Sequence, residues 1–156
     1  MAPVRIVTDS TADLPQELVE KYGITVVPLN VIFGDETYID GVEITPAEFY
    51  KKLARSPVLS ITSQPSPGTF ITAYQPLVDE GAEIISIHIS SLMSGTVQSA
   101  RLAKGMLKYP HLEVVDSRGV SISLGARVLE AARAAERGCS FQEVKELVES
   151  FNFRHK

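Results

Sequence analysis

The 156-residue sequence contains one cysteine, no tryptophan and three histidines that lie far apart. The single Cys139 cannot form an intrachain disulfide, and the histidine spacing matches no metal site. No apolar run approaches the ~20 residues needed to span a bilayer, and no signal peptide precedes the first predicted strand. We therefore expect a cytoplasmic protein in a reducing compartment, with neither a metal nor another cofactor.

Positive charge is also scarce, with 15 Lys and Arg against 19 Asp and Glu and a net charge of −4. The basic side chains are scattered along predicted helices, whereas a nucleic-acid partner needs them clustered. The sequence has no Gly-x-Gly-x-x-Gly run and no Walker-type Gly-Lys-Ser/Thr loop, which are the usual marks of a nucleotide site. Nucleic acids and nucleotides are therefore poor candidates for the main partner.

Apolar runs of strand length alternate with segments of helical periodicity along the whole chain. The predicted strands cover 4–8, 24–33, 37–39, 58–61, 84–89 and 112–115, and the predicted helices cover 14–22, 46–55, 67–81, 97–107 and 119–137, with a last helix from 140. Such alternation predicts an α/β fold, a mostly parallel β-sheet flanked by helices on both faces. No linker interrupts the pattern, so residues 1–156 are expected to form one domain.

Small polar side chains follow four of the predicted strands, at 8–11, 62–63, 90–96 and 116–117. Because the carboxyl ends of parallel strands meet at one edge of a sheet, we expect these segments to converge on one rim. Arg118 is the one cation close to them in sequence. A phosphate would normally meet a bidentate arginine or a lysine loop, so the rim favours a ligand that needs less positive charge.

The segment 84–101 is the most informative of the four. An isoleucine-rich strand passes through a turn containing Ser91, Ser94, Gly95 and Thr96 into a helix. The unpaired N–H groups at such a helix start, together with the hydroxyls, suit a carboxylate or a phosphate. A second interpretation is that Ser94 only caps the helix, and both stay open on this segment alone.

An enzyme is the alternative that these residues raise, either a small phosphatase using Asp9 or an acyl hydrolase using Ser94. An aspartyl phosphatase would carry a second Asp at position 11, where the sequence has Thr11. A serine hydrolase would carry glycine where the sequence has Leu92. His88 lies inside a predicted strand, so we expect it to be a hydrogen-bonded sheet residue and Asp9 to accept hydrogen bonds from its own turn.

Five ordered motifs, at 6–13, 28–31, 62–67, 87–96 and 115–117, together resemble the DegV family of bacterial fatty-acid-binding proteins. The resemblance covers essentially the whole chain. It implies a non-catalytic α/β domain that binds a long-chain fatty acid, and a role as the acyl-binding subunit of a fatty acid kinase that presents the carboxylate to a separate kinase protein. It assigns the carboxylate contacts to Thr62 and Ser94. The further candidates for ligand binding are Ser63, Gly95, Thr96, Ser91, Asp9 and Ser10.

The chain departs from the family in length, because members continue into a second α/β domain that supplies basic side chains and the other wall of the lipid tunnel. We expect the surface left by that domain to favour self-association. An acyl tail of about fourteen methylenes offers on the order of 11 kcal/mol at ~0.8 kcal/mol each. Each hydroxyl bonded to the carboxylate adds about 1.5–3 kcal/mol at most. The tail is therefore expected to supply affinity and the hydroxyls to set position.

Overall fold

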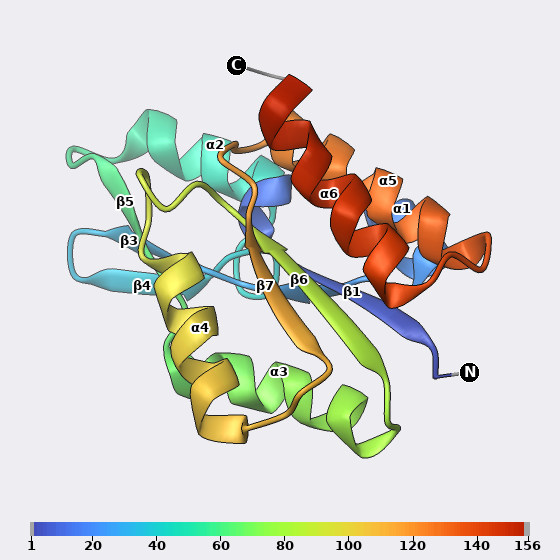
Figure 1. Cartoon of the computed structure of the whole chain (residues 1–156). Helices are drawn as coiled ribbons and strands as arrows, with labels where there is room; N and C mark the ends of the chain where they lie inside the picture. The colour runs from blue at the N-terminus through green and yellow to red at the C-terminus, as the bar shows by residue number, and fades with distance from the viewer. Residues whose placement is uncertain (1, 155–156) are drawn as a thin grey trace.

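The computed structural model describes residues 2–154, and a four-stranded parallel sheet forms its centre (Figure 1). The strand order is β2 (Thr25–Val27), β1 (Val4–Asp9), β6 (Glu83–His88) and β7 (Leu112–Asp116). Every pair in this sheet is parallel. Its carboxyl edge therefore collects the ends of β1, β6 and β7, which three of the four polar segments follow.

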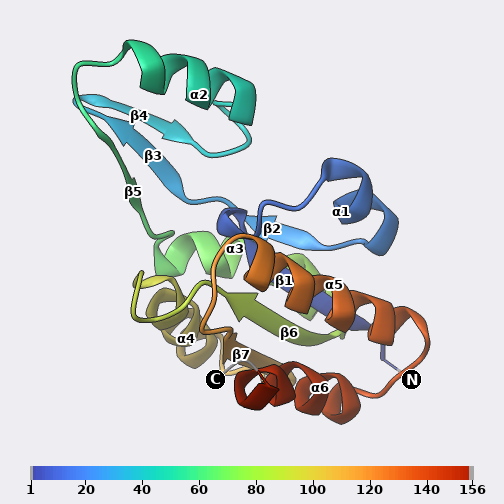
Figure 2. The same cartoon turned by 90° about the horizontal axis from the view of Figure 1, so that it is seen from above.

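Helices cover both faces of this sheet, as the alternating pattern predicts (Figures 1 and 2). One face packs on α5 (Ile122–Glu136) and α6 (Phe141–Arg154), and the other on α3 (Pro67–Asp79) and α4 (Thr96–Leu107). Successive residues of β6 serve opposite faces, because Ile85 and Ile87 lie in the α5–α6 core and Ile84 in the α3–α4 core. The predicted α/β fold is confirmed.

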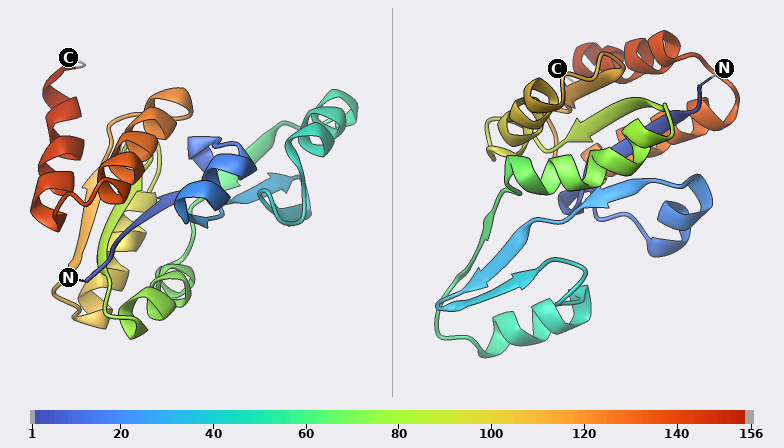
Figure 3. Two further views of the ribbon diagram at one scale, coloured as in Figure 1. Left: turned by 90° about the vertical axis from the view of Figure 1, so that its right-hand side faces the viewer. Right: turned by 90° about the horizontal axis from the view of Figure 1, so that it is seen from below.

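A second, smaller sheet projects from the main body (Figures 2 and 3). It is antiparallel, with the order β4 (Glu36–Ile39), β3 (Asn30–Phe33) and β5 (Ser60–Ser63). Its small core contains Val31, Phe33 and Ile44, and α2 (Pro46–Arg55) contributes Phe49 to that core. The expected return strand near 37–39 is therefore present as β4.

The sequence prediction was wrong about the segment 24–33, which forms two strands in different sheets. The chain leaves β2 at Pro28, which has no N–H to continue a ladder, and the Leu29 N–H donates to Ser10 Oγ at 3.0 Å. The strand expected at 58–61 also lies two residues later and pairs only with β3 among the described residues. Its end, at 62–63, consequently belongs to the small sheet and not to the parallel rim.

Several predicted boundaries are confirmed because their signals are local. Thr45 and Glu48 form a reciprocal capping box at the start of α2, and Ser140 and Glu143 exchange the same pair of bonds before α6. The helix α1 (Gln16–Tyr22) ends at Gly23, whose φ of 60° is left-handed. Within residues 2–154 no helix has the length and apolar character needed to cross a bilayer.

Candidate functional site

The candidate site begins at the amino end of α4, where Gly95 is the N-cap residue and gives no side-chain cap. Ser94 lies one position earlier, where its Oγ accepts the Thr96 N–H at 3.2 Å and bonds Thr96 Oγ1 at 2.8 Å. Ser94 is half-buried and Thr96 is buried. Two hydroxyls therefore stand beside a helix start whose remaining N–H groups receive no cap from a side chain, a favourable place for an anion.

The end of β5 reaches the same place through Gln64. A Cβ built on Gly95 would lie 2.9 Å from Gln64 Nε2 and 3.1 Å from its Cδ, so the amide lies directly against the glycine. Figure 2 shows the end of β5 beside the start of α4. Thr62 is two residues before Gln64, on the same side of an extended chain, and is exposed. A side chain at position 95 would displace the Gln64 amide from this position.

The other candidate residues tie neighbouring segments to this region. Ser63 Oγ accepts from Asn30 Nδ2 at 3.4 Å, and Ser10 Oγ accepts from the Leu29 N–H. Ser91 donates its hydroxyl to Asp116 Oδ2 at 2.5 Å, which joins the loop after β6 to the end of β7. Ser63, Ser10 and Ser91 thus have protein partners and help to hold the loops in place.

The expected convergence of four strand ends is only partly correct. The ends of β1, β6 and β7 do meet on the parallel edge, because Ile89 N donates to Asp9 Oδ2 at 3.0 Å and Ser117 N donates to the His88 carbonyl at 3.1 Å. The fourth segment arrives from the antiparallel sheet, by way of Gln64. Sequence reasoning gave Gln64 no role, because its contact with Gly95 is tertiary and leaves no spacing signal.

The geometry supports neither a phosphatase that uses Asp9 nor an acyl hydrolase that uses Ser94. Asp9 is fully buried, and its carboxylate accepts the N–H and hydroxyl of Thr11 as well as the Ile89 N–H. His88 bonds Asp9 and Ser86, so it is not the base of Ser94. The expectations for His88 as a hydrogen-bonded sheet residue and for Asp9 as the acceptor of its turn are both confirmed.

Large apolar side chains lie exposed on the segments that carry the site. Ile61 and Leu59 belong to β5 and the residue before it, and their exposed fractions are 61% and 86%. Leu92 and Met93, in the loop that leads to Ser94, are 95% and 62% exposed. We call these four side chains the apolar margin. Leu92 and Met93 lie beside Ser94 in the chain, whereas Leu59 and Ile61 alternate with Thr62 and point to the opposite face of β5.

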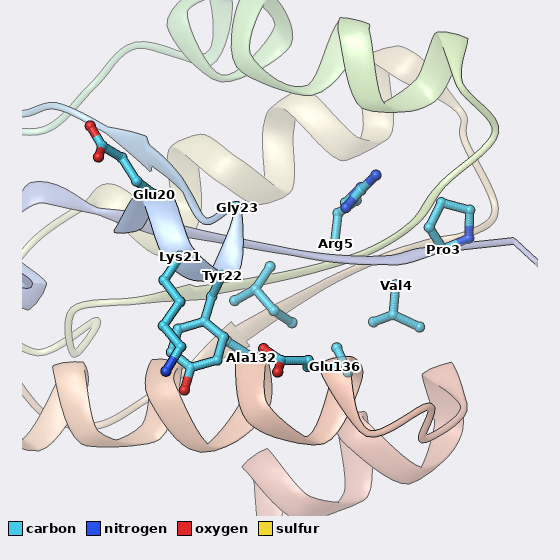
Figure 4. Close-up of a pocket in the computed structure, with 11 residues that line it drawn as sticks. Pro3, Val4, Arg5, Glu20, Lys21, Tyr22, Gly23, Ala132 and Glu136 are labelled. Carbon is cyan, nitrogen blue, oxygen red and sulfur yellow. The ribbon is translucent and has the colours of Figure 1, made fainter. Parts of the chain in front are cut away.

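Two cavities lie away from the candidate site. One of about 450 Å³ lies at the amino end of β1, where Arg5, Lys21, Tyr22 and Glu136 line it (Figure 4). A second, of about 460 Å³, adjoins it near Phe141. Both are at the opposite edge of the parallel sheet from the candidate site, and neither is lined by Thr62 or Ser94.

The carboxyl edge of the parallel sheet also has a buried arginine to which the sequence analysis assigned no role. Arg127 belongs to α5, on the face of the sheet opposite α4, and only 6% of it is exposed. Burial lowers the pKa of Arg127, which the Asp116 carboxylate counteracts. The Arg127 Nη1 lies 3.0 Å from where a Cβ on Gly119 would be, and it has no hydrogen-bond partner among the described residues. The guanidinium therefore lies behind the loop after β7, whose Asp116 carboxylate accepts from Ser91.

The sequence matches a family model and several curated relatives. The model of a family described as uncharacterised DegV proteins matches residues 3–156. A DegV domain-containing protein of Clostridium perfringens is 45% identical over 153 residues, which cover 97% of this chain and 55% of that protein. One from Clostridium acetobutylicum is 41% identical over 96% of this chain and 54% of its own length. The chain thus spans about half the length of the curated relatives it matches.

Solved structures agree with the sequence relatives. A DegV family protein from Thermus thermophilus, described for its fatty acid binding, has a TM-score of 0.86 and 40% identity, covering 95% of this chain and 52% of that one. A stearic-acid-binding protein from Eubacterium ventriosum has a TM-score of 0.87 and 32% identity, covering 96% and 52%. The DegV fatty acid binding protein of Bacillus subtilis has a TM-score of 0.86 and 35% identity, covering 96% and 54%.

Proposed function

The chain belongs to the DegV family, and we propose that it binds a long-chain fatty acid as a non-catalytic carrier. The fatty acids of its structural neighbours support this ligand class. The observation that carries the proposal is the contact of Gln64 with Gly95, which brings the end of β5 to the uncapped start of α4. This approach supports a site in which hydroxyls from both segments would meet one carboxylate.

In this proposal Thr62 and Ser94 donate hydrogen bonds to the carboxylate oxygens. Gly95 and Thr96 shape the start of α4, and Ser63 holds the end of β5 through Asn30. Ser91, Ser10 and Asp9 support the site without contacting the ligand, because their polar atoms already bond protein groups. The negative head group gains from the dipole at the start of α4.

The acyl tail follows the apolar margin. The methyl and methylene groups of Leu92 and Met93 beside Ser94, and of Leu59 and Ile61 where the tail passes the edge of β5, gain by leaving water together with the tail, at about 25 cal/mol per Å² of apolar surface. Each further methylene of the ligand that is buried adds ~0.8 kcal/mol, which corresponds to about fourfold in Kd. Affinity should therefore rise with chain length far more than with any single hydroxyl.

The family resemblance further supports presentation of the bound carboxylate to a separate fatty acid kinase protein in the cytoplasm. The relatives are about twice as long, and in the proposal their additional part covers the apolar margin. In this chain alone the same surface offers a contact for a second copy, because exposed apolar patches of several hundred Å² promote association. Sedimentation at several concentrations measures that association directly.

The test is a series of equilibrium binding measurements with saturated fatty acids of eight to eighteen carbons. We expect Kd to fall by about fourfold per buried methylene and then to level off. Ser94→Ala and Thr62→Val each remove one hydroxyl and should raise Kd by about 5- to 30-fold, or 1–2 kcal/mol.

Thr37→Val is the matched control, because Thr37 is exposed on β4 of the same small sheet. It should leave the Kd unchanged. A wild-type protein that binds none of the fatty acids contradicts the proposed function. Equal losses from Thr37→Val and Thr62→Val contradict the assignment of Thr62 to the carboxylate.

A further inference from the structure

Four polar side chains form a continuous hydrogen-bonded row inside the molecule, beneath the candidate site. Tyr74 of α3 bonds Ser86 Oγ at 2.7 Å, Ser86 Oγ bonds His88 Nε2 at 2.5 Å, and His88 Nδ1 bonds Asp9 Oδ2 at 3.0 Å. All four side chains are 0% exposed. We call them the buried row. It links α3, β6 and β1, which lie side by side in Figures 1 and 2.

Asp9 is the acceptor end of the row. Its Oδ1 accepts the N–H and the hydroxyl of Thr11, and its Oδ2 accepts the Ile89 N–H and the His88 ring nitrogen. Burial alone would raise the pKa of Asp9, but the hydrogen bonds from His88, Thr11 and Ile89 hold it below its ordinary value. An ionised carboxylate only accepts, so His88 Nδ1 must carry a proton.

Tyr74 is the donor end. Burial raises the pKa of Tyr74, so its hydroxyl keeps its proton. Tyr74 and His88 Nε2 are the two partners that the described hydrogen bonds give Ser86 Oγ. If Tyr74 donates to Ser86, the Ser86 proton has only His88 Nε2 to donate to, so the ring is neutral with its proton on Nδ1. A proton on Nε2 would leave the Ser86 proton without an acceptor. The reverse order would leave the Tyr74 proton without an acceptor in a site closed to water, at a cost of about 1–3 kcal/mol. The two ends therefore select one tautomer of His88.

The order Asp–His–Ser is also that of a catalytic triad, but access excludes that use here. Ser86 points into the α3–α4 side of the sheet, where Tyr74 covers its oxygen, and no part of it is exposed. Phe70 packs its ring edge-to-face on His88 with centroids 5.1 Å apart. Within the buried row, His88 contacts the ionisable Asp9 of β1 directly and the ionisable Tyr74 of α3 through Ser86.

The row acts on the candidate site through Ile89. The Ile89 N–H is fixed by Asp9, and the next residue, Ser90, donates its N–H to the Gly119 carbonyl at 2.9 Å. The Ser90 carbonyl in turn accepts the Ser94 N–H at 3.2 Å. Only these two steps separate the buried carboxylate from Ser94. On the other side, Asp9 fixes Thr11, next to Ser10 and the chain crossing to the small sheet.

We propose that the buried row is a positioning device, in which Asp9 and the Nδ1–H tautomer of His88 set the geometry of the Ser90–Ser94 loop without touching the ligand. Asp9 is then a positioning residue. The claim about affinity rests on the proposed function, whereas the claim about the tautomer stands on the row alone.

The first measurement is the protonation of the His88 ring by long-range ¹H–¹⁵N correlation in the full chain. The chain has three histidines, so single substitutions assign the resonances. We expect a neutral ring protonated on Nδ1 at pH 7 and slow hydrogen exchange at the Ile89 amide. A ring protonated on Nε2, or on both nitrogens, would overturn the inference.

The second measurement uses Asp9→Asn. Whichever way the new amide turns, its NH₂ group faces two donors, so either the Thr11 or the His88 and Ile89 contacts are lost. We expect faster exchange at Ile89 and fatty acid binding weakened by about tenfold or more. Asp13→Asn is the control, because Asp13 is exposed and has a left-handed φ of 50° that asparagine tolerates.

If the Asp9→Asn variant does not fold, Thr11→Val is used in its place. The Thr11→Val change removes only one hydroxyl donor to Asp9. Its expected loss is about threefold in affinity, with the His88 tautomer retained. Affinity equal to that of Asp13→Asn would overturn the positioning claim. If the wild-type protein binds no fatty acid, the proposed function fails, and the tautomer and the Ile89 exchange rate still decide the inference about the row.

Discussion

The replacement of Gly95 by alanine separates the geometry of the site from the stability of the fold. The new Cβ would lie 2.9 Å from Gln64 Nε2 and 3.1 Å from its Cδ. Since ordinary carbon contacts begin near ~3.5 Å, the Gln64 amide must retreat by about half an ångström or swing away. Gln64 is exposed, so this movement is free of obstruction from a packed core. The methyl group would then occupy the uncapped start of α4.

The expected effect on stability is small. The backbone of Gly95, at φ −80° and ψ 9°, suits alanine. Alanine at an N-cap costs about 0.5–1 kcal/mol relative to glycine, and the loss of chain freedom in the unfolded state returns about 0.4–1 kcal/mol. The free energy of unfolding should therefore change by less than about 1 kcal/mol.

The expected effect on binding is larger, because in the proposed site the new methyl group obstructs one hydrogen-bonding position for the carboxylate. We expect Kd to rise about tenfold, or ~1.4 kcal/mol. Gln64→Ala should cause a similar loss, and the double variant should be no weaker than either single one, since both remove the same contact. Titration of a fatty acid against all four proteins measures this cycle. Additive losses would refute the idea that Gln64 and Gly95 act together.

Two further predictions concern the fold. Gly125→Ala would place a Cβ 2.7 Å from the Ala12 carbonyl oxygen, a backbone atom that cannot move aside, so we expect urea denaturation to show a loss of about 1–3 kcal/mol. The matched change Gly105→Ala in α4 meets nothing within 4 Å and should instead stabilise by about 0.5–1 kcal/mol, and similar changes from both would contradict the packing argument. Asp9 should make the fold sensitive to acid. Burial raises the pKa of Asp9, but hydrogen bonds from His88 and Thr11 hold it below the ordinary value. The ionised carboxylate therefore stabilises the fold fully above about pH 4, and this stabilisation is lost as the pH falls through the lower pKa of the folded state. Denaturation between pH 2.5 and 7 should show a flatter acid limb for Asp9→Asn, and an acid limb as steep as that of the wild type would count against it.

The candidate site was harder to predict than the fold. The hydroxyls of Ser94 and Thr96 could be found from the sequence, because a strand followed by a small polar turn and a helix is a local pattern. The role of Gln64 could not, because only the return of β5 from the small sheet brings it to Gly95. The position of Thr62 was predicted on the wrong sheet, since a short polar strand fits either a parallel or an antiparallel neighbour equally well.

The sequence by itself determined the parallel sheet and the ends of several helices. The uninterrupted apolar run of β6 requires cover on both faces, and the capping boxes at Thr45 and Ser140 act within four residues. Only the tertiary structure decided that Asp9 and His88 meet across 79 positions and that β5 leaves the main sheet. Periodicity records which face of an element is buried, whereas the choice of hydrogen-bond partner between distant strands depends on packing that no local spacing encodes.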